Sequence, residues 1–432
     1  MTPAARISAA IEVIEDIVGR RRPAADALKD WGLSRRFAGS KDRAAIASLV
    51  YDALRRKASS GYAMASQEPR ALVLGMLAGL RGMSVSEIGG LCSGESHAPA
   101  RLSEDETALL TVFSAGDAPD WVQADVPEWL WPSFASAFGA AAVAEGQALA
   151  ARAPVDLRVN RLKASRKEVA AALSHAQPQE GAWSPDALRF EPGPDGRGPS
   201  LQTEAPFFAG AFEIQDEGSQ LVTLLAAPQP GQTVIDLCAG AGGKTLALAA
   251  LMANRGTLYA TDLDGRRLAP LHDRLARSGA SIVDIRIPRS RGHEPLEDVA
   301  GQADLVLVDA PCTGSGTWRR NPDAKWRVRP GALAERVKDQ AEVLARAARL
   351  VRPGGRIAYI TCSMLPEEND EAIRAFLGKQ PGFAPIAPID MLKSAETDFS
   401  LLARFATEFG LQLTPRRTGT DGFYLACLRR GD

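Results

Sequence analysis

One stretch of the sequence places a glycine-rich loop between a short apolar run and a helical run. Val234-Ile235 leads into Asp236-Leu237-Cys238-Ala239-Gly240-Ala241-Gly242-Gly243-Lys244-Thr245, and a helical pattern follows from Leu246 to Met252. Glycines let backbone amides approach a ligand closely, and the start of a helix offers unpaired N–H donors. The stretch predicts one unit of a doubly wound α/β fold, with a binding loop at the edge of a parallel sheet.

The next predicted strand, residues 257–261, is followed by a carboxylate, Asp262. This position lies roughly 20 residues beyond the glycine loop, where nucleoside-binding α/β folds hold an acid that accepts hydrogen bonds from ribose hydroxyls. We therefore expect the ligand of the loop to be a nucleoside-containing cofactor.

The loop also approaches the phosphate-binding pattern of nucleotide hydrolases, because Gly243-Lys244-Thr245 matches its end. The first glycine of that pattern would fall at position 238, which is cysteine. A cysteine is ill suited to a turn that the pattern gives to glycine, so the sequence argues against a hydrolase. We expect Cys238 to be a small packing residue beside the cofactor.

Two further cysteines each follow a short apolar run. Cys312 comes after residues 305–308, within Asp309-Ala310-Pro311-Cys312, and Cys362 comes after residues 357–360. Both runs are typical of interior strands of a parallel sheet, whose chemistry lies just beyond the carboxyl ends of the strands. We expect the two thiols to face one crevice.

The rest of the chain suggests three regions. Residues 1–130 show helical patterns, such as Ile7, Ile11, Ile14 and Val18 on one face, and end in a connection rich in proline and glycine. Residues 140–210 read as a small α+β region that includes a loop at 191–199, and residues 211–432 alternate strands and helices. The final run from Phe423 to Leu428 predicts an antiparallel closing strand.

Composition excludes several classes of protein. No apolar stretch reaches the roughly 18 to 20 residues of a membrane span. The five cysteines are scattered among 432 residues, and the four histidines show no paired spacing. We therefore expect a cytoplasmic monomer with reduced thiols and no metal.

Basic residues gather locally although the net charge is only −1. One cluster follows Cys312 and is interleaved with Trp318 and Trp326; its members are Arg319, Arg320, Lys325, Arg327 and Arg329. This combination suits phosphate contacts and base stacking, so we expect it to contact RNA. Smaller clusters at residues 20–22, 35–43 and 55–57 are equally compatible with a solvated surface.

Thiols beside a nucleoside-cofactor site suit one reaction in particular. A thiolate that adds to carbon 6 of a pyrimidine activates carbon 5 towards methylation, and a carboxylic acid near ring nitrogen 3 stabilises the developing charge. A base must then remove the carbon-5 proton before the thiol can leave. This chemistry alone does not decide whether Cys312 or Cys362 is the nucleophile.

Five segments resemble, in order and spacing, the RsmB/Sun/nucleolar-protein family of S-adenosylmethionine-dependent RNA cytosine-5 methyltransferases; they are residues 212–220, 238–245, 309–326, 361–369 and 420–424. The resemblance covers about half of the chain densely. Residues 37–43 and 50–56 resemble the NusB-like domain that ribosomal RNA members carry. The resemblance implies a Rossmann-like class I methyltransferase domain after an all-α domain and an RNA-binding region.

The family resemblance also implies roles for individual residues. Cys362 would be the nucleophile, Cys312 would assist breakdown of the covalent adduct, Asp309 would face the cytosine edge and Lys244 would be the active-site lysine. The implied contacts to S-adenosyl-L-methionine are Cys238, Ala239, Gly240, Ala241, Gly242, Gly243, Lys244, Asp262 and Asp309. The expected substrate is a cytidine of small-subunit ribosomal RNA, and the alternatives are transfer RNA or a non-catalytic RNA-binding assembly factor.

One position departs from the family pattern. Members usually carry an acid after the third strand of the sheet, beside the adenine, whereas here Pro288 or Ser290 occupies the expected place. Asp284 comes too early and reads as an ordinary outward strand residue. The adenine contact is therefore unassigned from the sequence.

Overall fold

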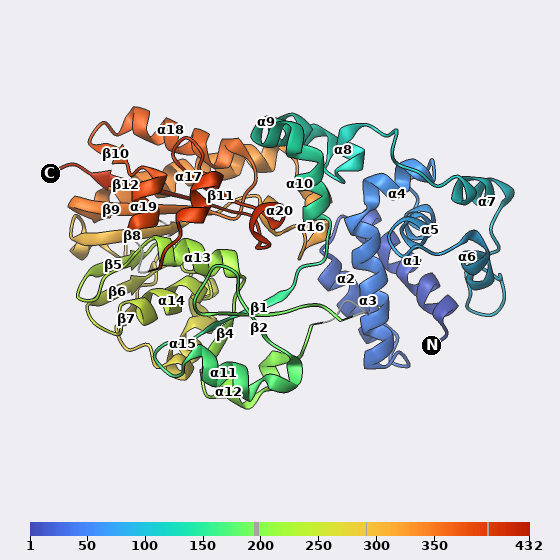
Figure 1. The fold of residues 1–432 in the computed structure, drawn as a ribbon, viewed down its shortest axis with the longest axis horizontal. Helices are drawn as coiled ribbons and strands as arrows, with labels where there is room; N and C mark the ends of the chain where they lie inside the picture. The colour runs from blue at the N-terminus through green and yellow to red at the C-terminus, as the bar shows by residue number, and fades with distance from the viewer. Residues whose placement is uncertain (194–197, 291, 395–396) are drawn as a thin grey trace. The chain divides into compact units, whose positions relative to one another are not determined.

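The computed structural model describes residues 1–193, 198–290, 292–394 and 397–432, and they form two compact units. The first unit contains Met1–Arg152 and Trp318–Arg329. The second contains the described residues from 153 to 317 and Pro330–Asp432. Figure 1 shows the course of the chain from the N-terminus in blue to the C-terminus in red. The predicted loop at 191–199 lies partly outside the described residues, and the three domain boundaries stay predictions.

The first unit is helical. Its helices are α1 (Pro3–Arg20), α2 (Ala24–Ser34), α3 (Ser40–Arg55), α4 (Lys57–Ala63), α5 (Pro69–Gly79), α6 (Val85–Leu91), α7 (Glu104–Thr111), α8 (Asp120–Gln123), α9 (Trp131–Phe138), α10 (Ala142–Leu149) and α16 (Pro322–Arg327). The core is built from spaced apolar residues of α1, α3 and α5, among them Ile14, Ile46 and Leu72. Val18 was expected on the buried face of α1 but is 37% exposed, because Val13 and Ile17 take the inward positions instead.

The segment Trp318–Arg329 is part of this helical unit, although it follows the Cys312 loop in the sequence. The Nε1 of Trp326 donates to the carbonyl of Leu54 (2.7 Å), and the backbone N–H of Ala24 donates to Asp323 (3.2 Å). Lys325 and Trp318 are each only 1% exposed. The expectation that the whole cluster contacts RNA is therefore wrong for Trp318 and Lys325, since both are packing residues.

The second unit contains a small antiparallel sheet in the order β2-β3-β1-β4. Its strands are β1 (Val155–Val159), β2 (Gln179–Glu180), β3 (Ala187–Phe190) and β4 (Phe212–Ile214), accompanied by α11 (Arg166–Ala172) and α12 (Ala205–Phe208). Leu157, Phe190 and Phe212 form the centre of its apolar core. This region carries the predicted strand and helix after residue 155.

The larger sheet of the second unit has the order β10-β12-β9-β8-β5-β6-β7, with β11 beside β12. The strands are β5 (Thr233–Asp236), β6 (Thr257–Ala260), β7 (Val283–Ile285), β8 (Ala303–Asp309), β9 (Val351–Thr361), β10 (Phe383–Pro385), β11 (Gly410–Leu413) and β12 (Phe423–Arg430). The five strands from β9 to β7 are parallel, and β12 pairs with β9 in the antiparallel direction. This arrangement confirms the predicted α/β class and the closing strand.

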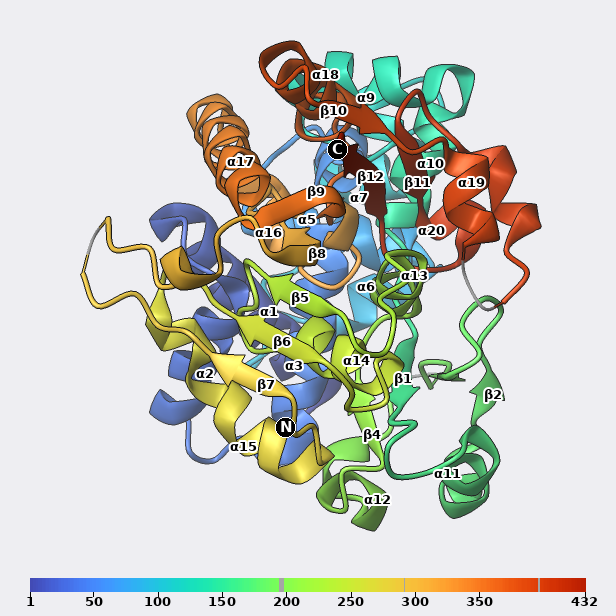
Figure 2. The same ribbon diagram turned by 90° about the vertical axis from the view of Figure 1, so that its left-hand side faces the viewer.

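Helices cover both faces of this sheet, as Figure 2 shows for α17 (Pro330–Leu350) and α13 (Glu217–Leu225). The remaining helices are α14 (Gly243–Leu251), α15 (Ala269–Ser278), α18 (Asp370–Lys379), α19 (Pro388–Lys393) and α20 (Pro415–Thr418). Alternate residues of β8 enter different cores: Leu305 and Leu307 face one, whereas Val306 and Val308 face the other. Burial on both faces explains why the strand is apolar throughout.

Lys325 supplies a test of the helical unit. Its ammonium group lies near the rings of Trp318 and Trp326 (6.0 and 5.0 Å) and donates to the carbonyl of Arg55 (3.3 Å). Burial lowers the pKa of Lys325 from 10.5 to about 7. The folded protein thus releases this proton near pH 7, while the unfolded chain keeps it until about pH 10.5, so its contribution to stability rises with pH across that window.

We expect Lys325→Met to raise the free energy of unfolding relative to wild type at pH 6, because the variant no longer buries a charge there. The advantage should shrink at pH 9. Urea denaturation, monitored by tryptophan fluorescence, measures the free energy of unfolding at both pH values. Lys41→Met changes an exposed lysine and serves as the control. An advantage of Lys325→Met that does not change between the two pH values would contradict the buried charge.

Candidate active site

The two cysteines that follow β8 and β9 lie in contact. The Sγ atoms of Cys312 and Cys362 are 3.3 Å apart. They meet because β8 and β9 are parallel neighbours, with Asp309 opposite Ile360, and both loops leave the same edge of the sheet. The backbone N–H of Gly316 also donates to the carbonyl of Cys362 (2.9 Å), which joins the loops. The two thiols lie together as expected, and the crevice that they were expected to face stays a prediction.

Lys244 and Asp309 form an ion pair at the same edge. Lys244 begins α14 and Asp309 ends β8, and the ammonium nitrogen lies 2.8 Å from the Oδ2 of Asp309. Burial of Lys244 disfavours its charge, but the neighbouring carboxylate outweighs this effect, so the pKa of Lys244 is raised. The ring of Phe423 lies 5.2 Å from the ammonium group. Lys244 thus stays a cation, and Asp309, whose side chain is 34% exposed, can face a ligand.

The glycine loop has the geometry of a binding loop. Gly240 and Gly242 have φ angles of +51° and +86°, which side chains rarely adopt. A Cβ atom at Gly242 would meet the Cδ1 of Leu271 at 2.2 Å, so only glycine fits there. The backbone N–H of Gly240 donates to the Oδ2 of Asp262 (3.0 Å), which brings the loop and the acid after β6 together.

Cys238 is half-buried at the start of this loop and packs against one of the two apolar cores of the sheet. Burial raises the pKa of the Cys238 thiol. A thiol that resists ionisation suits the packing role expected from the sequence, and its contact to the cofactor stays a prediction.

Two large apolar side chains are exposed beside Asp262. Leu263 is 73% exposed and Ile287 is 48% exposed. They belong to the loops after β6 and β7, and the Cγ2 of Ile287 lies against Gly265 of the β6 loop. Asp284 lies in β7, faces outward and pairs with Arg286 (2.7 Å), as the sequence suggested for it. Apolar surface, rather than an acid, therefore follows the third strand.

Sequence reasoning missed a buried acid beside the thiols. Glu368 is fully buried in the turn after Cys362, and it accepts hydrogen bonds from Thr313, Gln340 and Ser363. The only signal in the sequence was the pair Glu367-Glu368 in a segment that resembles the family, and the pattern could not tell which acid turns inward.

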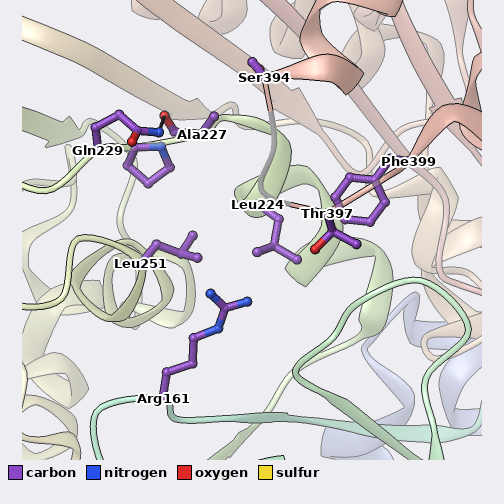
Figure 3. A pocket seen from close by; sticks show the side chains of 9 residues that line it. Arg161, Leu224, Ala227, Gln229, Leu251, Ser394, Thr397 and Phe399 are labelled. Atoms are coloured by element: carbon purple, nitrogen blue, oxygen red, sulfur yellow. Dashed lines mark hydrogen bonds between the residues drawn. The ribbon is translucent and has the colours of Figure 1, made fainter.

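A separate pocket lies at the opposite edge of the sheet. Its walls come from the segments before β5 and after α14, including Leu224, Gln229 and Leu251, with Arg161 reaching into it (Figure 3). These segments adjoin the amino ends of the parallel strands, whereas the thiols follow the carboxyl ends, so this pocket is not the thiol site. Within the described ranges, no group of three or more His, Cys, Asp and Glu residues could hold a metal ion. No described helix is long and apolar enough to span a membrane.

Comparison with known proteins extends these observations. A family model described as 16S rRNA methyltransferase RsmB/F matches residues 222–429, and a model of the ferredoxin-like domain of RsmF/B-like methyltransferases matches residues 126–195. The crystal structure of PH0851 is similar over 100% of this chain and 99% of its own, with 28% identity and a TM-score of 0.73.

Curated relatives carry the same description. Ribosomal RNA small subunit methyltransferase B of Cronobacter sakazakii is 34% identical over 76% of this chain and 71% of its own length. The probable methyltransferase B of Bacillus subtilis is 33% identical over 70% of this chain. The chain spans 66% and 64% of the lengths of the relatives from Bacillus subtilis and Sodalis glossinidius. With a family match that includes both cysteine loops, these similarities show that the chain belongs to the RsmB/F family of 16S rRNA methyltransferases.

Proposed function

We propose that this protein transfers a methyl group from S-adenosyl-L-methionine to carbon 5 of a cytidine in small-subunit ribosomal RNA, as a cytoplasmic monomer. The observation that carries the proposal is the contact between the thiols of Cys312 and Cys362, beside the Lys244–Asp309 pair and next to the strand that bears the glycine loop. Membership in the RsmB/F family supports the substrate class.

The residues around the glycine loop fit the cofactor. The left-handed backbone of Gly240 and Gly242 gives the loop its shape, and Asp262 lies where a ribose would be held. Leu263 and Ile287 would offer apolar surface to the adenine, the contact that the sequence left unassigned. The cofactor supplies an electrophilic methyl group when it is bound.

The chain's own residues carry out the steps on the base. Cys362 loses its proton, and its sulfur forms a bond to carbon 6, so that electron density moves to carbon 5. Asp309, held by Lys244, faces the edge of the base; in its protonated form it donates a hydrogen bond to nitrogen 3 and stabilises the negative charge that develops on the ring. Carbon 5 then takes the methyl group.

Breakdown of the adduct requires the second thiol. A base removes the proton from carbon 5, the carbon 5–carbon 6 double bond forms again and the sulfur of Cys362 leaves. Cys312 lies within contact distance of Cys362 and assists this step. The target base lies in folded RNA, so it must first be unstacked and turned into the site.

We expect Cys362→Ala to abolish incorporation of labelled methyl into unmodified small-subunit ribosomal RNA, because no adduct forms. Cys427→Ala, which removes a buried thiol elsewhere in the second unit, should keep activity near that of wild type. Cys362→Ala protein that still transfers methyl groups would contradict the assigned nucleophile. Bulk transfer RNA is assayed in parallel. If it is the RNA that becomes methylated and ribosomal RNA is not, transfer RNA is the substrate.

We expect Cys312→Ala to accumulate a covalent complex with RNA that survives denaturing electrophoresis, since the adduct forms but breaks down slowly. The complex should be absent from the double variant Cys312→Ala/Cys362→Ala. Normal turnover by Cys312→Ala without an adduct would contradict the division of labour between the thiols. No transfer and no adduct on any RNA, with cofactor binding intact, would favour a non-catalytic assembly factor.

The adenine contact has its own test. We expect Leu263→Ser and Ile287→Ser each to weaken cofactor binding about tenfold, because each removes apolar surface worth roughly 1.4 kcal/mol on binding. Leu401→Ser and Ile389→Ser change equally exposed apolar residues elsewhere in the same unit and serve as matched controls. Isothermal titration with S-adenosyl-L-methionine measures the dissociation constants, and equal values for all four variants would contradict the assignment.

A further inference from the structure

Glu368 is a buried carboxylate between the two cysteine loops. It ends the short 3-10 turn Pro366–Glu368, six residues after Cys362, and has no exposed surface. A carboxylate in such a place is costly unless hydrogen bonds compensate for the lost water. Four hydrogen bonds meet its two oxygens, and they come from three different segments of the second unit.

Two of these hydrogen bonds come from the residue after Cys312. The backbone N–H of Thr313 donates to Oε1 (2.8 Å), and its hydroxyl donates to Oε2 (2.5 Å). Gln340 of α17 donates to Oε1 (3.2 Å) and also to the carbonyl of Pro311 (3.0 Å), directly before Cys312. Glu368 and Gln340 therefore hold the chain on both sides of Cys312.

The other hydrogen bond comes from the residue after Cys362. The hydroxyl of Ser363 donates to Oε2 of Glu368, and the amide of Asn369 donates to the carbonyl of Ser363 (3.0 Å). Asn369 also accepts from the hydroxyl of Thr361 (2.6 Å), directly before Cys362. One carboxylate thus joins both cysteine loops.

The charge of Glu368 also acts on Cys312. The titratable groups that face Cys312 are Cys362, Glu368 and Tyr359. The hydrogen bond with Cys362, burial and the Glu368 carboxylate all raise the pKa of Cys312. Cys362 has a cation among its neighbours, Lys244. A negative charge is therefore disfavoured on Cys312.

We propose that Glu368 is the positioning residue that sets the direction of the hydrogen bond between the two thiols, so that Cys312 donates the hydrogen bond and Cys362 accepts it as the thiolate. This inference rests on the proposed function and deepens it, because it explains why only one of two touching thiols attacks the base. The proton that Cys362 loses passes to solvent, and Cys312 keeps its own until the adduct breaks down.

The test compares the reactivity of the two thiols in the full-length protein without RNA or cofactor. Iodoacetamide alkylates the thiolate form, and mass spectrometry of the two cysteine peptides gives the rate at each site as a function of pH. Wild type should alkylate Cys362 faster than Cys312. In Glu368→Gln the alkylation of Cys312 should become faster and shift to lower pH, because the neighbouring negative charge is gone.

Glu371→Gln removes a carboxylate from the exposed side of α18 and should leave both pH profiles at the wild-type values. Glu368→Asp keeps the negative charge, so Cys362 should stay the faster site of alkylation. This second variant keeps the proposal testable if Glu368→Gln does not fold. Profiles of Glu368→Gln identical to those of wild type, or a reversed order of the thiols in Glu368→Asp, would overturn the proposal.

Methyl transfer gives a second readout. In Glu368→Gln the single-turnover rate should fall about tenfold or more, while the dissociation constant for S-adenosyl-L-methionine stays unchanged, as expected for a residue that positions the nucleophile and not the cofactor. An unchanged rate would overturn the positioning role. The alkylation test needs no substrate, so its result does not depend on methyl transfer. If Cys362 is alkylated faster than Cys312 but no methyl transfer occurs, the proposed function is refuted and the inference on the thiol pair stands.

Discussion

The parallel pairing of β8 with β9 is the constraint on which the site depends. It places the residues after Asp309 beside those after Thr361, so that two loops from distant parts of the sequence leave one edge of the sheet together. The contact between Cys312 and Cys362 follows from this register, and so does the place of Glu368, which holds both loops. β5, on the other side of β8, brings Lys244 to Asp309. The chemistry therefore depends on an accurately paired central sheet.

Chain connectivity links the Cys312 loop to the helical unit. The loop continues directly into Trp318–Arg329, which is part of that unit. Trp318 and Lys325 are buried there, and Trp326 is anchored to Leu54. A segment fixed by such packing has little freedom within the helical unit. This gives Trp318 and Lys325 a structural role instead of a role in RNA contact.

Local patterns allowed much of the second unit to be predicted. The glycine loop, the apolar strands, the antiparallel closing strand and the meeting of two thiols all follow from short-range sequence features combined with the rules of parallel sheets. The role of Glu368 could not be predicted, because its burial depends on hydrogen bonds from residues up to 55 positions away. Trp318 and Lys325 were misinterpreted because a mixed aromatic and basic segment suits RNA contact and internal packing equally well. Ile287 carried no polar signal, so its exposure beside Asp262 became visible only in three dimensions.

The proposed reaction depends on a division of labour in which Cys362 attacks the base while Cys312 assists. RNA that contains 5-fluorocytidine tests it most directly, because fluorine at carbon 5 cannot leave as a proton and the adduct is trapped in the wild-type protein. Peptide mapping of the trapped complex by mass spectrometry shows which cysteine carries the nucleotide. The account predicts a methylated nucleotide bound to Cys362. A nucleotide bound to Cys312 would contradict it.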